Sequence, residues 1–300
     1  MLLMMLITYS AWGTTVSIPQ TLGQYIDWNN ATITNCKVEN NGANIGNTGS
    51  RTVVTFTLSN STEQDFYLTM KSGAKGLTAV ITVSIKNGET VLFTQDCNVK
   101  NTGSWTPSTE HRLLLGTLPQ SNNLTLEIKV KSTTGSYAGN YGALALYGST
   151  QYDNIPNGVG DYINLNAGTH SGARYETNND NIGNIKNGTY SIYNVWNTAD
   201  IYAATKMDVI GSYNAGQVKV TVTDVISGAK ETQQTFDVTA TEKGKTISFS
   251  DPIMKGPKQI RMDYISSSGG YIMNYKNLQF VKVSDYSASA DLTLKTLSVD

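Results

Sequence analysis

The chain repeats itself at an almost constant spacing, and this repeat constrains its fold more than any other feature. Residues 25–47 match residues 162–184 without a gap, at an offset of 137 positions. The repeat includes a glutamate, an Asn-Ile-Gly-Asn motif and, at an offset of 134, an Asn-Tyr pair: Glu39 and Glu176, positions 44–47 and 181–184, and Asn140-Tyr141 and Asn274-Tyr275. Each copy has the length of one ordinary domain. The repeat therefore predicts two domains with the same fold.

Duplication also bears on the class of function. Two weak sites on one chain reinforce each other when both engage the same polymer, so duplication raises the overall affinity of a binding protein. A catalytic chain gains less from a second copy of its fold. The repeat therefore favours a binding protein over an enzyme.

Alternating apolar and polar residues dominate both copies, as expected for strands with one face on a core and the other in water. The clearest alternating segments are 53–58, 78–86 and 124–130 in the first copy and 218–223 in the second, with shorter stretches at 247–249 and 278–283. The sequence shows no amphipathic helix longer than a turn or two. This pattern predicts an all-β protein with two tandem antiparallel β-sandwich (jelly-roll) domains.

The two ends of the chain and the stretch between the copies set the expected boundaries. An apolar run at residues 1–7 precedes Ala11 and Gly13, which have signal-peptidase spacing, so this segment resembles a secretory leader. Residues 291–300 begin another alternating strand, which belongs either to a further, truncated domain or to an extension packed on the second copy. The expected segments are a leader at 1–13, module one at 17–148, a linker at 149–160, module two at 161–284, and a linker with the start of a further domain at 285–300.

Charge and composition narrow the class of ligand. The net charge is −1 and the 22 Lys and Arg residues are scattered, whereas a nucleic-acid-binding face needs clustered basic residues. Charged residues make up only 15% of the chain, which suits contact with a neutral polar ligand but is also common in extracellular all-β proteins.

The location of the chain follows from its apolar segments. Because the chain has an expected secretory leader and no apolar run long enough to span a bilayer, we expect a secreted or cell-surface monomer. Cys36 and Cys97 then form either one disulfide or two free thiols.

Residues that could carry catalysis are few. His111 and His170 occupy non-equivalent places in the two copies, lack a recognisable catalytic motif, and are expected in loops or at the surface. No Cys/His spacing fits a zinc site. Glu39 and Glu176 leave one shared acidic residue in each copy, whereas glycoside hydrolysis usually uses a pair. We therefore expect no catalytic and no metal-binding residues.

One set of residues combines the groups needed to bind a sugar. Trp105 lies in a segment flanked by glycine and proline, which would hold its indole near the surface, and Glu39 and Asn140 are repeated residues. A sugar ring has an apolar C–H face and a rim of hydroxyls, so its recognition takes an aromatic plane with amide or carboxylate groups. Each residue alone could have a purely structural role; together they favour a binding site in the first copy.

These residues resemble the pattern of carbohydrate-binding module family 6, a family of galactose-binding-like β-sandwiches found beside polysaccharide-degrading enzymes. The family pattern has a glutamate, an Asn-Ile/Val-Gly-Tyr turn, a Gly-x-Trp loop and an asparagine in the last strand. The matching positions are Glu39, 44–46, 103–105 and Asn140 in the first copy and Glu176, 181–183 and Asn274 in the second. The resemblance implies a cleft among loops at one edge of each sandwich, where two aromatic rings enclose a sugar.

The chain also departs from this family pattern. Asn47 and Asn184 stand where the family has a tyrosine, which removes one aromatic wall. The second copy has no tryptophan, because residues 242–245 occupy the corresponding loop, and Tyr271 or Tyr193 is the candidate replacement. We therefore expect the first copy to bind better than the second, which could be purely structural.

The resemblance implies eight candidate carbohydrate-binding residues: Glu39, Asn47, Trp105 and Asn140 in the first copy, and Glu176, Asn184, Tyr271 and Asn274 in the second. Segments 26–29 and 163–166 match the family's calcium-binding strand poorly, so we expect no cofactor, with a structural calcium ion as the poorly supported alternative. The expected function is non-catalytic binding of a polysaccharide or oligosaccharide, as the N-terminal accessory region of a secreted glycan-degrading protein. A structural spacer or cell-surface adhesin module is the alternative, and a glycoside hydrolase or polysaccharide lyase is a more distant one.

Overall fold

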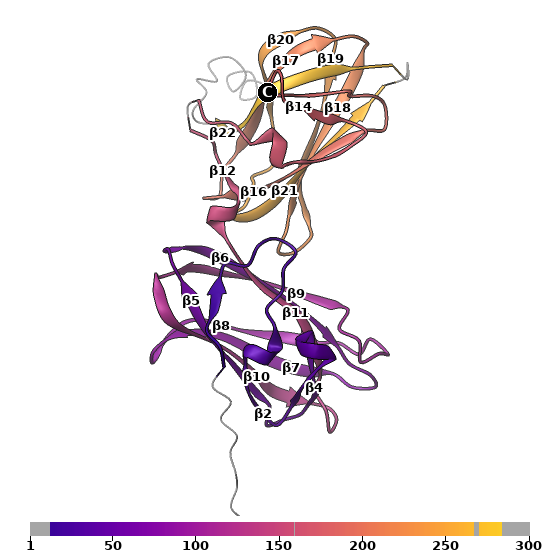
Figure 1. Cartoon of the computed structure of the whole chain (residues 1–300). Helices are drawn as coiled ribbons and strands as arrows, with labels where there is room; N and C mark the ends of the chain where they lie inside the picture. Colours follow the sequence, from indigo (N-terminus) through magenta and orange to yellow (C-terminus); the bar gives the residue numbers. More distant parts are fainter. Residues whose placement is uncertain (1–12, 159, 267–269, 284–300) are drawn as a thin grey trace, which may run out of the picture. The chain divides into compact units, whose positions relative to one another are not determined.

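The computed structural model describes residues 13–158, 160–266 and 270–283, in two compact units that divide between Gln151 and Tyr152 (Figure 1). Residues 1–12 of the expected leader and the expected segment 285–300 lie outside the described residues. The stretch 149–160 carries the 3-10 turn η3 (Ser149–Gln151) and strand β12 (Asp153–Ile155). Within the described ranges, no helix combines the length and apolar character needed to cross a membrane.

The first unit is built from two sheets. In one, the strands lie in the order β1 (Val16–Ile18), β5 (Val53–Asn60), β10 (Ser121–Thr133), β7 (Ala79–Asn87) and β8 (Thr90–Val99), with β2 (Thr32–Thr34) also paired to β5. In the other, the order is β3 (Lys37–Glu39), β4 (Asn44–Thr48), β11 (Gly139–Gly148), β6 (Gln64–Gly73) and β9 (Thr109–Leu118).

The second unit repeats this order strand for strand. One sheet runs β12, β16 (Tyr190–Asn197), β21 (Gly256–Ile265), β18 (Gly216–Asp224) and β19 (Lys230–Val238), with β13 (Thr169–Ser171) paired to β16. The other runs β14 (Arg174–Glu176), β15 (Asn181–Gly183), β22 (Met273–Lys282), β17 (Ala203–Ser212) and β20 (Glu242–Ser248). The predicted architecture of two tandem, mainly antiparallel β-sandwiches is confirmed, with β1–β5 and β12–β16 as parallel pairs.

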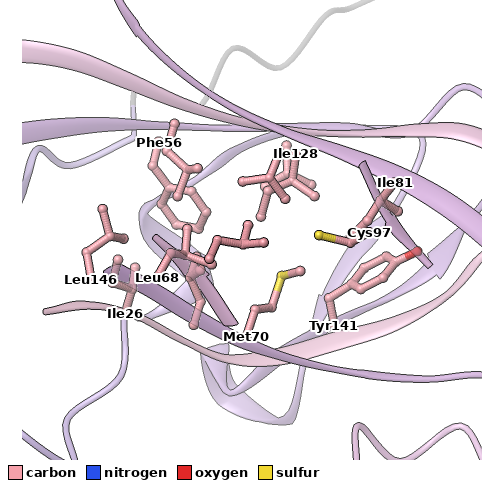
Figure 2. Close-up of a cluster of buried hydrophobic side chains, with 14 of the residues drawn as sticks. Ile26, Phe56, Leu68, Met70, Ile81, Cys97, Ile128, Tyr141 and Leu146 are labelled. Carbon is pink, nitrogen blue, oxygen red and sulfur yellow. The ribbon is translucent and has the colours of Figure 1, made fainter. Parts of the chain in front are cut away.

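Alternation along the strands places each core between its two sheets. In β5 every second residue from Val54 to Asn60 is buried. Figure 2 shows Phe56 and Ile128 from one sheet of the first unit together with Leu68 and Met70 from the other. Each such side chain contributes about 1.5–3 kcal/mol when it leaves water. The period-2 pattern in the sequence is therefore the pattern of core contacts.

The second core contains a network of hydroxyl groups. The hydroxyl of Tyr193 is 2.7 Å from that of Tyr275, and the Tyr264 hydroxyl is 3.0 Å from both the Tyr275 hydroxyl and Ser191 Oγ. Nδ1 of His170, in β13, lies 3.0 Å from the same Ser191 Oγ. Burial raises the pKa of Tyr193 and of Tyr264 well above the ordinary value, so both remain protonated donors. His170 therefore anchors a buried network and does not lie in a loop.

His111 also differs from the sequence expectation. It lies in β9, two residues before the buried Leu113, so it faces the interior. Its Nε2 is 2.7 Å from the buried Ser72 Oγ. Burial, helped by the charge of Lys100, lowers the pKa of His111. The expectation of loop or surface histidines was wrong, because His111 occupies an inward-facing position of the ten-residue strand β9 and His170 is the half-buried central residue of β13.

One lysine lies in the interior of the second unit. The side chain of Lys258, in β21, is 1% exposed, and its ammonium is 2.9 Å from Asp224 Oδ1 and 2.7 Å from Glu231 Oε1. Burial opposes the ionisation of Asp224, but hydrogen bonds from Ser227 and Lys258 outweigh it and lower the pKa of Asp224. The charged triad is therefore stable only while its lysine is present.

We expect Lys258→Met to lower the free energy of unfolding of the second unit by about 3–5 kcal/mol, because two partly buried carboxylates lose their counter-ion. Denaturant titration of the full chain measures this change. Lys219→Met removes a more exposed pair with Asp263, at 3.4 Å, and is the matched control, with an expected cost below about 1 kcal/mol. Equal costs for the two variants would contradict the prediction.

Cys36 and Cys97 are free thiols in the structure. Cys97 lies inside the first core (Figure 2), and Cys36 is half-buried against the same cluster. Burial raises the pKa of both thiols to about 11. Of the two alternatives that the sequence left open, the structure has the unbridged one.

The raised pKa predicts slow alkylation. At pH 8, iodoacetamide should modify both cysteines about 100-fold more slowly than a thiol of pKa 9.0, and the rate should rise about tenfold per pH unit. Mass spectrometry follows the reaction, with the guanidinium-unfolded chain as the fast-reacting control. Two cysteines that stay unmodified even after unfolding would instead indicate a disulfide.

Candidate functional site

A pocket of about 390 Å³ opens on the first unit. Its lining side chains come from the end of β3, from β4, from the β8–β9 and β10–β11 loops and from the start of β11: Glu39, Asn47, Trp105, Tyr137, Gly139 and Asn140. The volume lies within the usual range of small-molecule sites. Glu39 is the one charged residue among these lining residues. The pocket thus combines two aromatic rings, two amides and a carboxylate.

The aromatic wall of this pocket is a pair of rings. The ring centroids of Trp105 and Tyr137 are 5.9 Å apart and their planes meet at 78°, an edge-to-face arrangement. Trp105 is 36% exposed and Tyr137 is 49% exposed, so both rings remain accessible. Large apolar rings left open to water beside amides and a carboxylate are typical of a ligand site.

The β8–β9 loop holds the indole in place through local hydrogen bonds. The Thr102 amide donates to the Ala74 carbonyl at 2.8 Å, and the Thr102 hydroxyl donates to the Ser104 carbonyl at 2.9 Å. The Gly103 amide donates to Asn101 Oδ1 at 3.0 Å, which forms an Asx turn. These bonds order the loop before any ligand arrives, so less conformational entropy is lost on binding.

The carboxylate of Glu39 is fixed by its neighbours. Asn44 Nδ2 donates to Glu39 Oε2 at 3.1 Å, and Asn140 Nδ2 lies 3.5 Å from the same oxygen. Lys37 Nζ is 3.5 Å from Oε1. Gly46 makes room for the carboxylate, because a Cβ atom at this position would lie 2.4 Å from Oε2. The repeated glutamate, asparagine and glycine therefore form one structural unit.

The last residue of the motif has a different role. Asn47 adopts φ 54° and Asn184, its equivalent in the second unit, adopts φ 58°. Asparagine tolerates this left-handed region far better than most residues, which explains its place at both positions. Asn47 is exposed on the first pocket, whereas Asn184 Nδ2 donates to the Gly172 carbonyl at 2.7 Å.

The second unit has a pocket of about 310 Å³ at the equivalent place. It is lined by Arg174, Glu176, Asn184, Tyr213, Tyr271 and Asn274. Asn181 Nδ2 donates to Glu176 Oε2 at 3.0 Å, and a Cβ atom on Gly183 would lie 2.4 Å from the Glu176 carboxyl carbon. The arrangement around Glu39 is therefore repeated around Glu176.

The aromatic pair of the second pocket comes partly from a different loop. Tyr213, in the β17–β18 loop, and Tyr271 have ring centroids 6.4 Å apart at an interplanar angle of 64°. The sequence predicted a loop at residues 242–245. This prediction was wrong, because these residues lie in β20. Tyr271 lines the pocket, whereas Tyr193, the other candidate replacement, is buried in the core.

The structure brings the eight candidate residues together in two groups of four. Glu39, Asn47, Trp105 and Asn140 line the first pocket, and Glu176, Asn184, Tyr271 and Asn274 line the second. Their role in binding stays a prediction. Sequence reasoning missed Tyr137, Gly139, Arg174 and Tyr213 as lining residues.

A signal for one of the missed residues was present. Tyr137 precedes Asn140 by three positions, as Tyr271 precedes Asn274, so the tyrosine shares the 134-residue offset of the Asn-Tyr pair. For Tyr213 the sequence offered no such signal, because the corresponding loop of the first unit has no aromatic residue at that place.

Neither histidine lines either pocket, and the serine beside His111 is fully buried. Among the residues that the structure describes, no three His, Cys, Asp or Glu side chains are grouped so as to hold a metal ion. The lining groups can bind a ligand through aromatic contacts and hydrogen bonds.

No family model matches the chain, and no curated protein matches it by sequence. Among solved structures, a β-1,3-glucan-binding family 6 module (CBM6) from Bacillus halodurans is similar, with 22% identity over 44% of this chain and 98% of that one (TM-score 0.32). The C-terminal CBM6 of LamC, a marine laminarinase from Zobellia galactanivorans, has 14% identity over 41% of this chain and 96% of that one (TM-score 0.34).

A tandem structure is also similar to the chain. The N-terminal CBM22-1–CBM22-2 tandem of Paenibacillus barcinonensis Xyn10C has 9% identity and covers 88% of this chain and 94% of that one (TM-score 0.26). These three similar structures are carbohydrate-binding modules, two of them of family 6. At these identities the likeness is one of fold alone.

The close approach of Gly46 to Glu39 predicts the effect of a single methyl group. Gly46→Ala should displace the Glu39 carboxylate and leave the fold stable, because the atom that must move is the end of a flexible side chain. The side-chain amide NMR signals of Asn44 and Asn140 should shift, and those of Asn181 should not. Gly183→Ala is the reciprocal control. Unchanged Asn44 and Asn140 signals in Gly46→Ala would contradict this account.

Proposed function

We propose that the chain binds a polysaccharide or oligosaccharide through the first pocket, without a cofactor and without transforming it. The observation that carries the proposal is the convergence of Trp105, Glu39 and Asn140 on one pocket, from three separate places in the sequence. Each supplies a group that sugar recognition needs. An indole ring covers the apolar face of a pyranose, and a carboxylate and a carboxamide bond its hydroxyls.

The hydrogen bonding of Glu39 and the arrangement of the two rings support binding of a neutral sugar in the first pocket. Glu39 Oε2 already accepts from Asn44, and its carboxylate oxygens can accept further hydrogen bonds from sugar hydroxyls. Tyr137 adds a second ring beside the indole at a steep angle, so the two rings form a corner that can hold one sugar residue. A buried or charge-lined pocket would not offer this combination.

The wider role follows from the duplication. Two such units on one chain suit an accessory region that keeps a secreted glycan-degrading protein on its substrate, since two weak sites raise the overall affinity. We propose this role and a secreted or cell-surface location together. A spacer or adhesin would show no retardation by glycans, and an enzyme would release sugar from them.

Trp105→Ala should weaken binding by about 2 kcal/mol or more, as expected for a central aromatic contact, which is about thirtyfold in affinity. Affinity electrophoresis of the full chain in gels containing a neutral polysaccharide, arabinoxylan or β-glucan, measures the change as lost retardation. Tyr25→Ala, at an exposed aromatic residue that does not line the pocket, is the matched control and should retain wild-type mobility.

Two outcomes would contradict the proposal. If the wild-type chain is not retarded by any member of a broad glycan panel, the spacer or adhesin interpretation replaces binding. If the chain releases sugar from these polysaccharides, and Glu39→Gln or Glu176→Gln abolishes the release, the chain is an enzyme.

A further inference from the structure

The two pockets differ in charge although they share one architecture. Glu39 is the charged residue lining the first pocket, whereas Arg174 and Glu176 both line the second. Arg174 Nε is 3.3 Å from Glu176 Oε1, so the guanidinium faces the carboxylate through one edge. The Arg174 side chain is 72% exposed, which leaves its other N–H groups open to a ligand.

A second cation lies beside the second pocket. The ammonium of Lys186 is 4.5 Å from the ring centroid of Tyr271, one of the lining residues. Within residues 13–158, 160–266 and 270–283, this ammonium has no carboxylate within ion-pair distance. Position 186 corresponds to Gly49 in the first unit, at the 137-residue offset, so the first pocket has no equivalent cation. The second pocket therefore carries an excess of positive charge.

We propose that the second pocket binds an acidic sugar, one that carries a carboxylate group, while the first binds a neutral one. This inference rests on the proposed function and assigns the substrate class of its second site. The Arg174 guanidinium can donate parallel hydrogen bonds to a carboxylate, the geometry that arginine forms with this group. The Lys186 ammonium adds attraction from the side of Tyr271, whose ring can cover the sugar face together with Tyr213.

The rest of the second pocket fits this ligand. Glu176 is held by Asn181 and Arg174, so its negative charge is already balanced when the ligand arrives. Two cations against one carboxylate leave one positive charge for the ligand. In the first pocket, Glu39 would repel an acidic sugar, and its nearest cation, Lys37, does not line the pocket. Charge complementarity of this kind sets specificity more than affinity.

The test uses the full chain with Trp105→Ala, which removes the aromatic face of the first pocket. Its retardation is measured in gels containing polygalacturonate or fully methyl-esterified polygalacturonate, two polymers that differ in the carboxylate charge. We expect retardation by the acidic polymer, at least about tenfold stronger than by the ester, and weaker in high salt. The net charge of −1 disfavours non-specific attraction to a polyanion. Glucuronoxylan and a neutral arabinoxylan form a second pair of the same kind.

In the Trp105→Ala chain, a second substitution, either Lys186→Met or Arg174→Gln, should weaken binding to the acidic polymer about tenfold. This is the effect expected for loss of a charge-assisted hydrogen bond. Lys37→Met, at the position equivalent to Arg174, is the matched control and should leave it unchanged. Equal retardation by both members of each polymer pair, or an unchanged affinity in Lys186→Met, would overturn the inference. The proposed function fails separately, when the chain with an intact Trp105 binds no neutral glycan.

Discussion

The contact on which both candidate sites depend is a carboxylate lying over a glycine. Glu39 occupies the space above Gly46, and Glu176 the space above Gly183, with an asparagine amide donating to each carboxylate. A side chain at either glycine would occupy the place of the acid. Because the glutamate is fixed on the sheet and not on a loop, each pocket has one rigid polar wall. The other lining residues of each pocket then have to lie close to this fixed glutamate.

The two units build similar aromatic walls from different loops. The first unit supplies Trp105 from the long β8–β9 loop, while the second has a short connection there and supplies Tyr213 from the β17–β18 loop. The equivalent tyrosines, Tyr137 and Tyr271, complete each pair. The polar wall is thus shared between the copies, and the aromatic wall is where they differ. Strands carry what is common to both sites, and loops carry what is particular to each.

The sequence predicted the parts of the structure that repeat or alternate. Alternation located β5, β7, β10, β18 and β22, because one face of each packs on a core. Edge strands such as β8, which leaves most of its residues exposed, carry little alternation and were missed. The repeat identified Glu39, Asn140 and their equivalents, whereas Arg174 and Tyr213 differ between the copies and needed coordinates. The histidines were misjudged for two reasons: three consecutive leucines at 113–115 hide the alternation of β9 around His111, and β13, which carries His170, has only three residues.

Left-handed backbone at the end of the Asn-Ile-Gly-Asn motif limits how these pockets can evolve. At φ 54° in one unit and 58° in the other, Asn47 and Asn184 accept few replacements beyond glycine and aspartate without strain. A β-branched or large aromatic residue at either position would have to rebuild the turn around it. Change in ligand preference is therefore confined to neighbouring positions with ordinary backbone geometry. Descendants of this chain would be expected to diversify their loops and preserve this amide.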